Sequence, residues 1–94
     1  MSYKLEFQPK ALKEWKKLDS SIQSQFKKKL KQRLENPKIK SAKLHGYETL
    51  YKIKLKNSGY RLVYSVKDQQ IVVLVVKIGK REKVYELLEN LMMR

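Results

Sequence analysis

The sequence predicts an α+β domain in which an antiparallel four-stranded sheet packs against an N-terminal helical hairpin. Alternating or continuous apolar patterns typical of strands occur once at the start of the chain and three times in its second half. Between them lie two consecutive segments with apolar residues at helical spacing. Because 94 residues allow one compact domain, we expect residues 1–94 to form a single unit in the order β-α-α-β-β-β-α.

The first half of the chain predicts one strand and the helical hairpin. Residues 3–7 alternate between apolar and polar side chains, as in a strand with one solvated face. Pro9 favours the start of a helix, where its missing N–H costs nothing. Asp19 supplies a cap for a second helix, which we expect to end before Pro37. The apolar positions of the two helices are Leu12, Trp15 and Leu18, then Ile22, Phe26, Leu30 and Leu34.

The second half predicts three strands and a short terminal helix. Residues 50–55 and 60–66 alternate, and the turn residues 57–59 between them indicate a hairpin. Residues 71–78 are almost continuously apolar, which is typical of a central strand covered on both faces. We expect the last helix over Val84 to Met92.

The charge composition indicates a polyanionic partner. Lys and Arg number 23 against 9 Asp and Glu, which gives a net charge of +14, while 41% of the residues are hydrophobic. A folded domain that tolerates this self-repulsion is typical of proteins that bind nucleic acid. Lys27, Lys28, Lys29, Lys31 and Arg33 form the densest basic run. This run fits either a solvated helix face or contacts to backbone phosphates, which provide affinity without chemistry.

Several classes of protein are excluded by composition. The chain has no cysteine and therefore no disulfide, zinc–thiolate site or cysteine nucleophile. His45 is the only histidine, so a His–His acid/base pair is excluded, and we expect His45 in a surface loop. The longest apolar run is too short to cross a bilayer, and the N-terminus shows no signal-peptide pattern. We expect a soluble, cytoplasmic protein with no membrane partner.

One set of residues could perform chemistry: Lys52, Lys54, Arg61, Arg81 and Tyr85. The two lysines share one face of a strand, and the phase of the next strand places Arg61 on the same face. Arg81 follows the last strand, and Tyr85 comes four residues later, on the same side if a helix has begun. The alternatives are a solvated sheet face for the cations and a core aromatic for Tyr85.

This set can support RNA cleavage without histidine. The reaction needs a base for the 2′-hydroxyl, stabilisation of a phosphorane-like transition state, and a proton for the leaving oxygen. Neighbouring positive charges lower the pKa of a lysine and can let one lysine of a cluster act as a base. Arginines keep their charge and suit phosphate binding, and a tyrosine can stack on a base or orient the hydroxyl.

Four segments occur along the chain in the order ALKEWKKL, LYKIKL, SGYRLVY and IGKRE. In these segments the sequence resembles the RelE toxins of bacterial RelBE toxin–antitoxin systems. The likeness runs from Tyr3 to about Glu82 and implies the RelE-like microbial RNase fold. It further implies a ribosome-dependent endoribonuclease that cuts mRNA in the A site by attack of the 2′-hydroxyl on the adjacent phosphate. No metal or cofactor is implied.

The resemblance also implies roles and partners. Lys52 and Lys54 match strand lysines with base and charge-stabilising roles, and Arg61 matches the arginine that stabilises the transition state. Arg81 matches a residue that contacts phosphate and protonates the leaving group. Tyr85 matches the tyrosine that stacks on or orients the nucleotide. The spacer from Arg81 to Tyr85 is shorter than in the family. The implied partners are an acidic RelB-type antitoxin, the 70S ribosome with its rRNA, A-site mRNA, and operator DNA only through the antitoxin complex.

Two alternatives belong to other functional classes. A ParE-type toxin shares the fold but inhibits DNA gyrase without cutting RNA, and joint presence of the five site residues argues against it. The other alternative is a non-enzymatic basic module that binds nucleic acid. Such a module should lose affinity modestly at each cation removed, whereas an enzyme should lose far more rate than binding.

Overall fold

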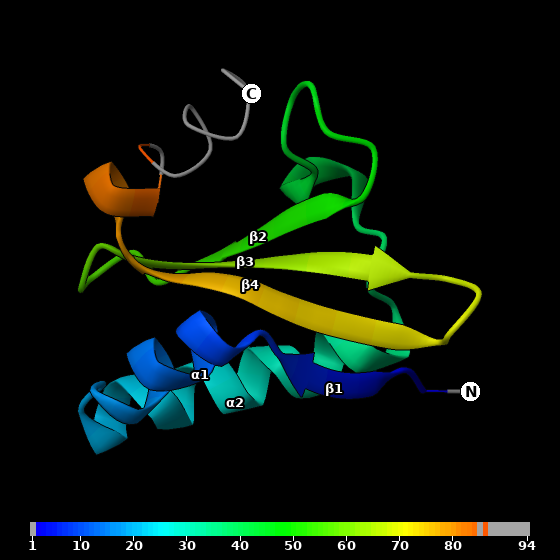
Figure 1. Cartoon of the computed structure of the whole chain (residues 1–94). Helices are drawn as coiled ribbons and strands as arrows, with labels where there is room; N and C mark the ends of the chain where they lie inside the picture. The colour runs from blue at the N-terminus through cyan, green and yellow to red at the C-terminus, as the bar shows by residue number, and fades with distance from the viewer. Residues whose placement is uncertain (1, 85, 87–94) are drawn as a thin grey trace.

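The computed structural model describes residues 2–84 and 86, and shows a four-stranded sheet with two helices on one face (Figure 1). The elements are β1 (Lys4–Phe7), α1 (Pro9–Lys16), α2 (Ser20–Glu35), the short 3-10 helix η1 (Lys40–Ala42), β2 (Leu50–Lys54), β3 (Tyr60–Lys67) and β4 (Val72–Lys80). The α+β class and the helical hairpin are confirmed. Residues 81–84 are already helical, so the last helix begins earlier than expected, and most of its predicted range lies outside the described residues.

The sheet is mixed, which corrects the expectation of a wholly antiparallel one. Its strand order is β1-β4-β3-β2, and the pairs β2–β3 and β3–β4 are antiparallel. The edge strand β1 instead runs parallel to β4, with Lys4 opposite Val72. Parallel strands need a long crossover, which the helical hairpin begins. Local alternation records which face of a strand is buried but carries no signal for the direction of its partner.

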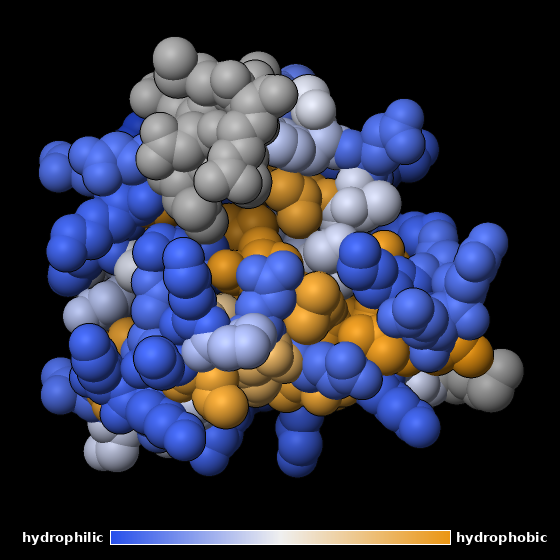
Figure 2. Space-filling view, in the orientation of Figure 1, coloured by the Kyte–Doolittle hydropathy of each residue, from blue (hydrophilic) through white to orange (hydrophobic). Residues whose placement is uncertain are grey.

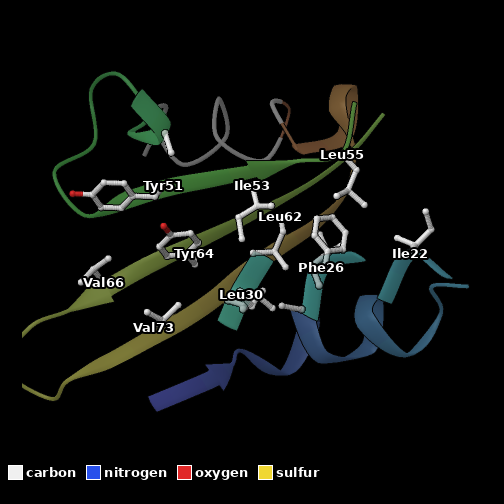
Figure 3. Packing of buried hydrophobic residues seen from close by; sticks show 14 residues of the cluster. Ile22, Phe26, Leu30, Tyr51, Ile53, Leu55, Leu62, Tyr64, Val66 and Val73 are labelled. Atoms are coloured by element: carbon white, nitrogen blue, oxygen red, sulfur yellow. The ribbon is translucent and has the colours of Figure 1, made fainter. Parts of the chain in front are cut away.

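The main core lies between the sheet and α2 (Figure 3). Phe26 and Leu30 of α2 are almost fully buried, as the four-residue spacing predicts. They pack against Tyr51 and Ile53 of β2, Leu55 directly after β2, and the alternating side chains Leu62, Tyr64 and Val66 of β3. Trp15 also packs here, with its ring 5.4 Å from that of Phe7, whereas Leu12 is 38% exposed and Ala11 takes the buried place on α1.

A second apolar cluster lies on the opposite face of the sheet. It contains Leu44, Leu50, Val63 and Val84. Figure 1 shows that the loop before β2 and the segment after β4 both rise from this face, away from α1 and α2. Among the described residues, these two segments therefore cover only part of the face opposite the helical hairpin.

A polar cluster of Tyr3, Lys38 and Asp68 joins three segments that are distant in sequence, beside the β3–β4 turn. The carboxylate of Asp68, in the β3–β4 turn, accepts a hydrogen bond from the Tyr3 hydroxyl (2.9 Å) and forms an ion pair with Lys38. These contacts stabilise the charged carboxylate and hold the pKa of Asp68 below its ordinary value of 3.8. Asp68 thus contributes stability at neutral pH.

This polar cluster predicts that the protein loses stability in acid. Because the folded-state pKa of Asp68 is lowered, its contribution is present above about pH 4 and is lost as the pH falls through the folded-state value. In urea unfolding followed between neutral and strongly acidic pH, Asp68→Asn should be less stable than the parent at neutral pH and should converge with it in acid. Parallel pH profiles for the two proteins would contradict this assignment.

Candidate active site

A row of residues crosses three strands on the face opposite the helices. Lys54 of β2 lies directly opposite Arg61 of β3, and Arg61 lies opposite Gly79 of β4. The predicted phase is confirmed, because the intervening residues Ile53 and Leu62 are buried on the helical side. Directly opposed residues of an antiparallel pair have Cβ atoms about 5 Å apart, so two like charges are held together here.

Lys52 extends this cationic face along β2. It lies two residues before Lys54, a separation of roughly 6–7 Å along a strand, and it is opposite Val63. Lys52 and Arg61 are half-buried, whereas Lys54 is exposed. Within the described part of the chain, none of these three cations forms a salt bridge with a carboxylate. A sheet face that carries such charges is suited to binding an anion.

Arg61 also has a buried hydrogen-bond donor without a partner among the described residues. This donor is the Nε of its guanidinium group. Buried donors in proteins are nearly always paired, so an unpaired one needs an explanation. An anion that binds this face would supply the missing acceptor.

Arg81 begins the helical segment at the end of β4, where two contacts fix the backbone. The Arg81 N–H donates to the carbonyl oxygen of Gly59 (3.3 Å), and the Lys80 Nζ donates to the carbonyl oxygen of Ser58 (2.6 Å). The Lys80 ammonium also lies 4.4 Å from the centre of the Tyr60 ring. The β2–β3 turn is thereby tied to the end of β4, and Arg81 is exposed beside the cationic row. Tyr85 lies outside the described residues.

Arg33 is a structural residue that the sequence interpretation missed. It was grouped with a basic run, of which Lys27, Lys28, Lys29 and Lys31 are indeed exposed. The Nη1 of Arg33 instead donates to the carbonyl oxygen of Lys52 (3.1 Å) and to the hydroxyl of Tyr64 (2.9 Å). A signal was present, since Arg33 follows Phe26 and Leu30 at helical spacing on the buried side of α2.

Tyr64 completes this network beneath β2. Its hydroxyl donates to the carbonyl oxygen of Pro37 (2.7 Å) while accepting from Arg33. Burial raises the pKa of Tyr64 above its ordinary value of 10.0, so the hydroxyl remains protonated and able to donate. Through Arg33, the network holds the backbone of Lys52 from the helical side.

Much of the visible surface of the described residues is hydrophilic (Figure 2). Figure 2 shows hydrophilic side chains over much of this view, with hydrophobic residues visible between them near the middle. His45 is exposed in the loop before β2, as expected. Among the described residues, no group of three or more His, Asp or Glu side chains could hold a metal ion, and no helix is long and apolar enough to span a membrane.

Comparison with known proteins connects this arrangement to one family. A family model described as "ParE toxin of type II toxin-antitoxin system, parDE" matches residues 5–85. The mRNA interferase toxin RelE of Escherichia coli strain K12 is 54% identical over 83 residues, which make up 88% of this chain and 87% of that protein. This chain belongs to the RelE/ParE family of type II toxins.

Solved structures of RelE agree with this membership. The isolated Escherichia coli RelE toxin matches with a TM-score of 0.83 and 48% identity, covering 97% of this chain and 99% of that one. A chain of the intact Escherichia coli RelBE toxin–antitoxin complex matches with a TM-score of 0.82 and 53% identity, over 84% of this chain and 96% of that one. The resemblance found in the sequence and its implied fold are therefore confirmed.

The network beneath β2 predicts unequal effects of two similar substitutions. Tyr64→Phe should lower the free energy of unfolding by about 1–3 kcal/mol, because it leaves the Pro37 carbonyl and one Arg33 donor unpaired. Tyr51 stacks on Tyr64 with ring centres 5.7 Å apart, and no hydrogen bond of its hydroxyl occurs among the described residues. Tyr51→Phe should therefore change stability by no more than about 0.5 kcal/mol in urea denaturation. Equal losses for the two variants would contradict this account.

Proposed function

We propose that this chain is the toxin of a type II toxin–antitoxin system and cleaves mRNA in the ribosomal A site. The observation that carries this proposal is the row formed by Lys54, Arg61 and Gly79, flanked by Lys52 and Arg81. In the described part of the chain, Lys52, Lys54 and Arg61 form no salt bridge with a carboxylate. The names of the RelE relatives point to mRNA as the anion that it receives.

The reaction is a transesterification within the RNA. The 2′-oxygen forms a bond to the adjacent phosphorus while the bond from phosphorus to the 5′-oxygen breaks. One proton leaves the 2′-hydroxyl and another reaches the departing 5′-oxygen. The products are a 2′,3′-cyclic phosphate and a 5′-hydroxyl, and the balance requires neither an oxidant nor a metal.

We assign the steps to the residues of the cationic face. Lys52 and Lys54 accept the proton of the 2′-hydroxyl and offset charge in the transition state. Arg61 stabilises the negative charge that grows on the phosphoryl oxygens, which is where preorganised cations contribute most. Arg81, exposed at the start of the helical turn, contacts the phosphate and protonates the leaving oxygen. Tyr85 stacks on or orients the nucleotide.

The partners follow from charge and from the site's shape. The described residues place the site on one face of the sheet and do not enclose a single-stranded RNA, so we assign presentation of the RNA to the ribosome in the cytoplasm. The net charge of +14 favours approach to rRNA. The same charge favours neutralisation by an acidic RelB-type antitoxin, in line with solved RelBE complexes. Operator DNA is reached only through that antitoxin.

The assignment predicts a separation of rate from binding. Arg61→Ala and Arg81→Ala should each lower the single-turnover rate of mRNA cleavage on programmed ribosomes by about 100- to 1000-fold, because each removes charge that acts in the transition state. Affinity for the ribosome should change far less. The matched control is Lys28→Ala, which removes an exposed charge on α2 and should leave the rate unchanged.

The same variants separate the two rival functions. A basic binding module should lose similar, modest affinity in all three variants, with the slope of log affinity against log salt reduced by about one each. A gyrase inhibitor should leave ribosome-bound mRNA intact and should reduce DNA supercoiling by purified gyrase. Either pattern would overturn the proposal.

A further inference from the structure

Gly79 occupies a strand position at which the fold does not need a glycine. The glycines with positive φ among the described residues are Gly46 and Gly59, so the backbone of Gly79 is open to other residue types. A Cβ added at Gly79 would lie 3.9 Å from the Cβ of Lys83 and from the Cγ2 of Val84, which is ordinary van der Waals contact. Glycine weakens a strand because it loses more backbone entropy and packs no side chain. The described part of the fold alone would favour alanine here.

The missing side chain would project onto the cationic face. Gly79 lies directly opposite Arg61, and the atoms nearest to the added Cβ include a methyl of Val84, which belongs to the apolar cluster on that face. Arg81 follows two residues later. The space left by Gly79 is therefore bordered by Arg61 on one side and by the helical turn that starts at Arg81 on the other.

We propose that Gly79 leaves this space for the scissile phosphate of the RNA. The inference rests on the proposed function and adds a positioning residue that the sequence interpretation did not include. Glycine lets a ligand approach the backbone more closely than any other residue does. Arg61, which is opposite Gly79 in the register, has a buried Nε without a hydrogen-bond partner among the described residues.

The surrounding contacts keep the space from widening. Lys80 Nζ holds the carbonyl of Ser58, and the Arg81 N–H holds that of Gly59, so the β2–β3 turn and the end of β4 are fastened together. Because Arg61 and Arg81 are attached to these fastened segments, a side chain added at position 79 displaces the phosphate and leaves the arginines in place. A shift of about 1 Å in a reacting group can cost on the order of 100-fold in rate.

The test compares two glycine-to-alanine variants of the full chain. Gly79→Ala should melt at the same temperature as the parent or higher, yet cleave mRNA on programmed ribosomes about 10- to 100-fold more slowly at saturating protein. Its half-saturating protein concentration should be nearly unchanged, and Gly79→Val should be slower still. The control is Gly59→Ala, whose φ of +76° strains alanine and should lower the melting temperature.

Each outcome decides the inference. If the parent cleaves mRNA and Gly79→Ala cleaves equally fast, Gly79 has no part in placing the phosphate, while the proposed function stands. If Gly79→Ala melts lower, as Gly59→Ala should, the glycine serves the backbone and the inference is wrong. If the parent leaves ribosome-bound mRNA intact, both the proposed function and this inference fall. The inference is supported if Gly79→Ala is as stable as the parent, binds the ribosome with unchanged affinity and cleaves mRNA more slowly.

Discussion

The hydrogen-bonded register of the sheet forces like charges together on one face. Lys54 and Arg61 are directly opposed, and no carboxylate among the described residues offsets them. Opposed like charges destabilise a strand pair, so this arrangement opposes folding. The almost fully buried side chains on the other face, such as Phe26 and Leu62, supply the stabilising burial that offsets it. A cationic face maintained at such a cost is a candidate for function, because binding of an anion relieves the repulsion.

The helical hairpin contributes to the site from the far side of the sheet. β2 is the edge strand of the described sheet, and on its outer side Tyr51 forms only an isolated bridge with Lys43 among the described residues. Arg33 of α2 bonds the carbonyl of Lys52 on this strand, and Tyr64 and Pro37 complete the network. An edge strand that carries two candidate catalytic lysines is thereby fixed in place. At the other end of the row, the contacts of Lys80 and Arg81 with the β2–β3 turn fix the end of β4 in place.

Sequence periodicity predicted which face of each strand is buried, but it did not predict how segments distant in sequence pair with one another. The phases of β2 and β3 were sufficient to place Lys52, Lys54 and Arg61 on one face, because alternation follows directly from strand geometry. The parallel β1–β4 pair was not predictable in this way, since pairing direction depends on the path of the whole crossover. Arg33 was missed because charge composition was weighed above its position on the buried side of α2. The roles of the five site residues stay predictions.

Toeprinting of a defined mRNA on programmed ribosomes, with and without this protein, tests the central claim most directly. The same mRNA free in solution serves as the parallel sample. The account predicts cuts within the A-site codon only when ribosomes are present, with a 2′,3′-cyclic phosphate on the upstream fragment. Intact mRNA on ribosomes, together with normal translation of a reporter, would contradict it.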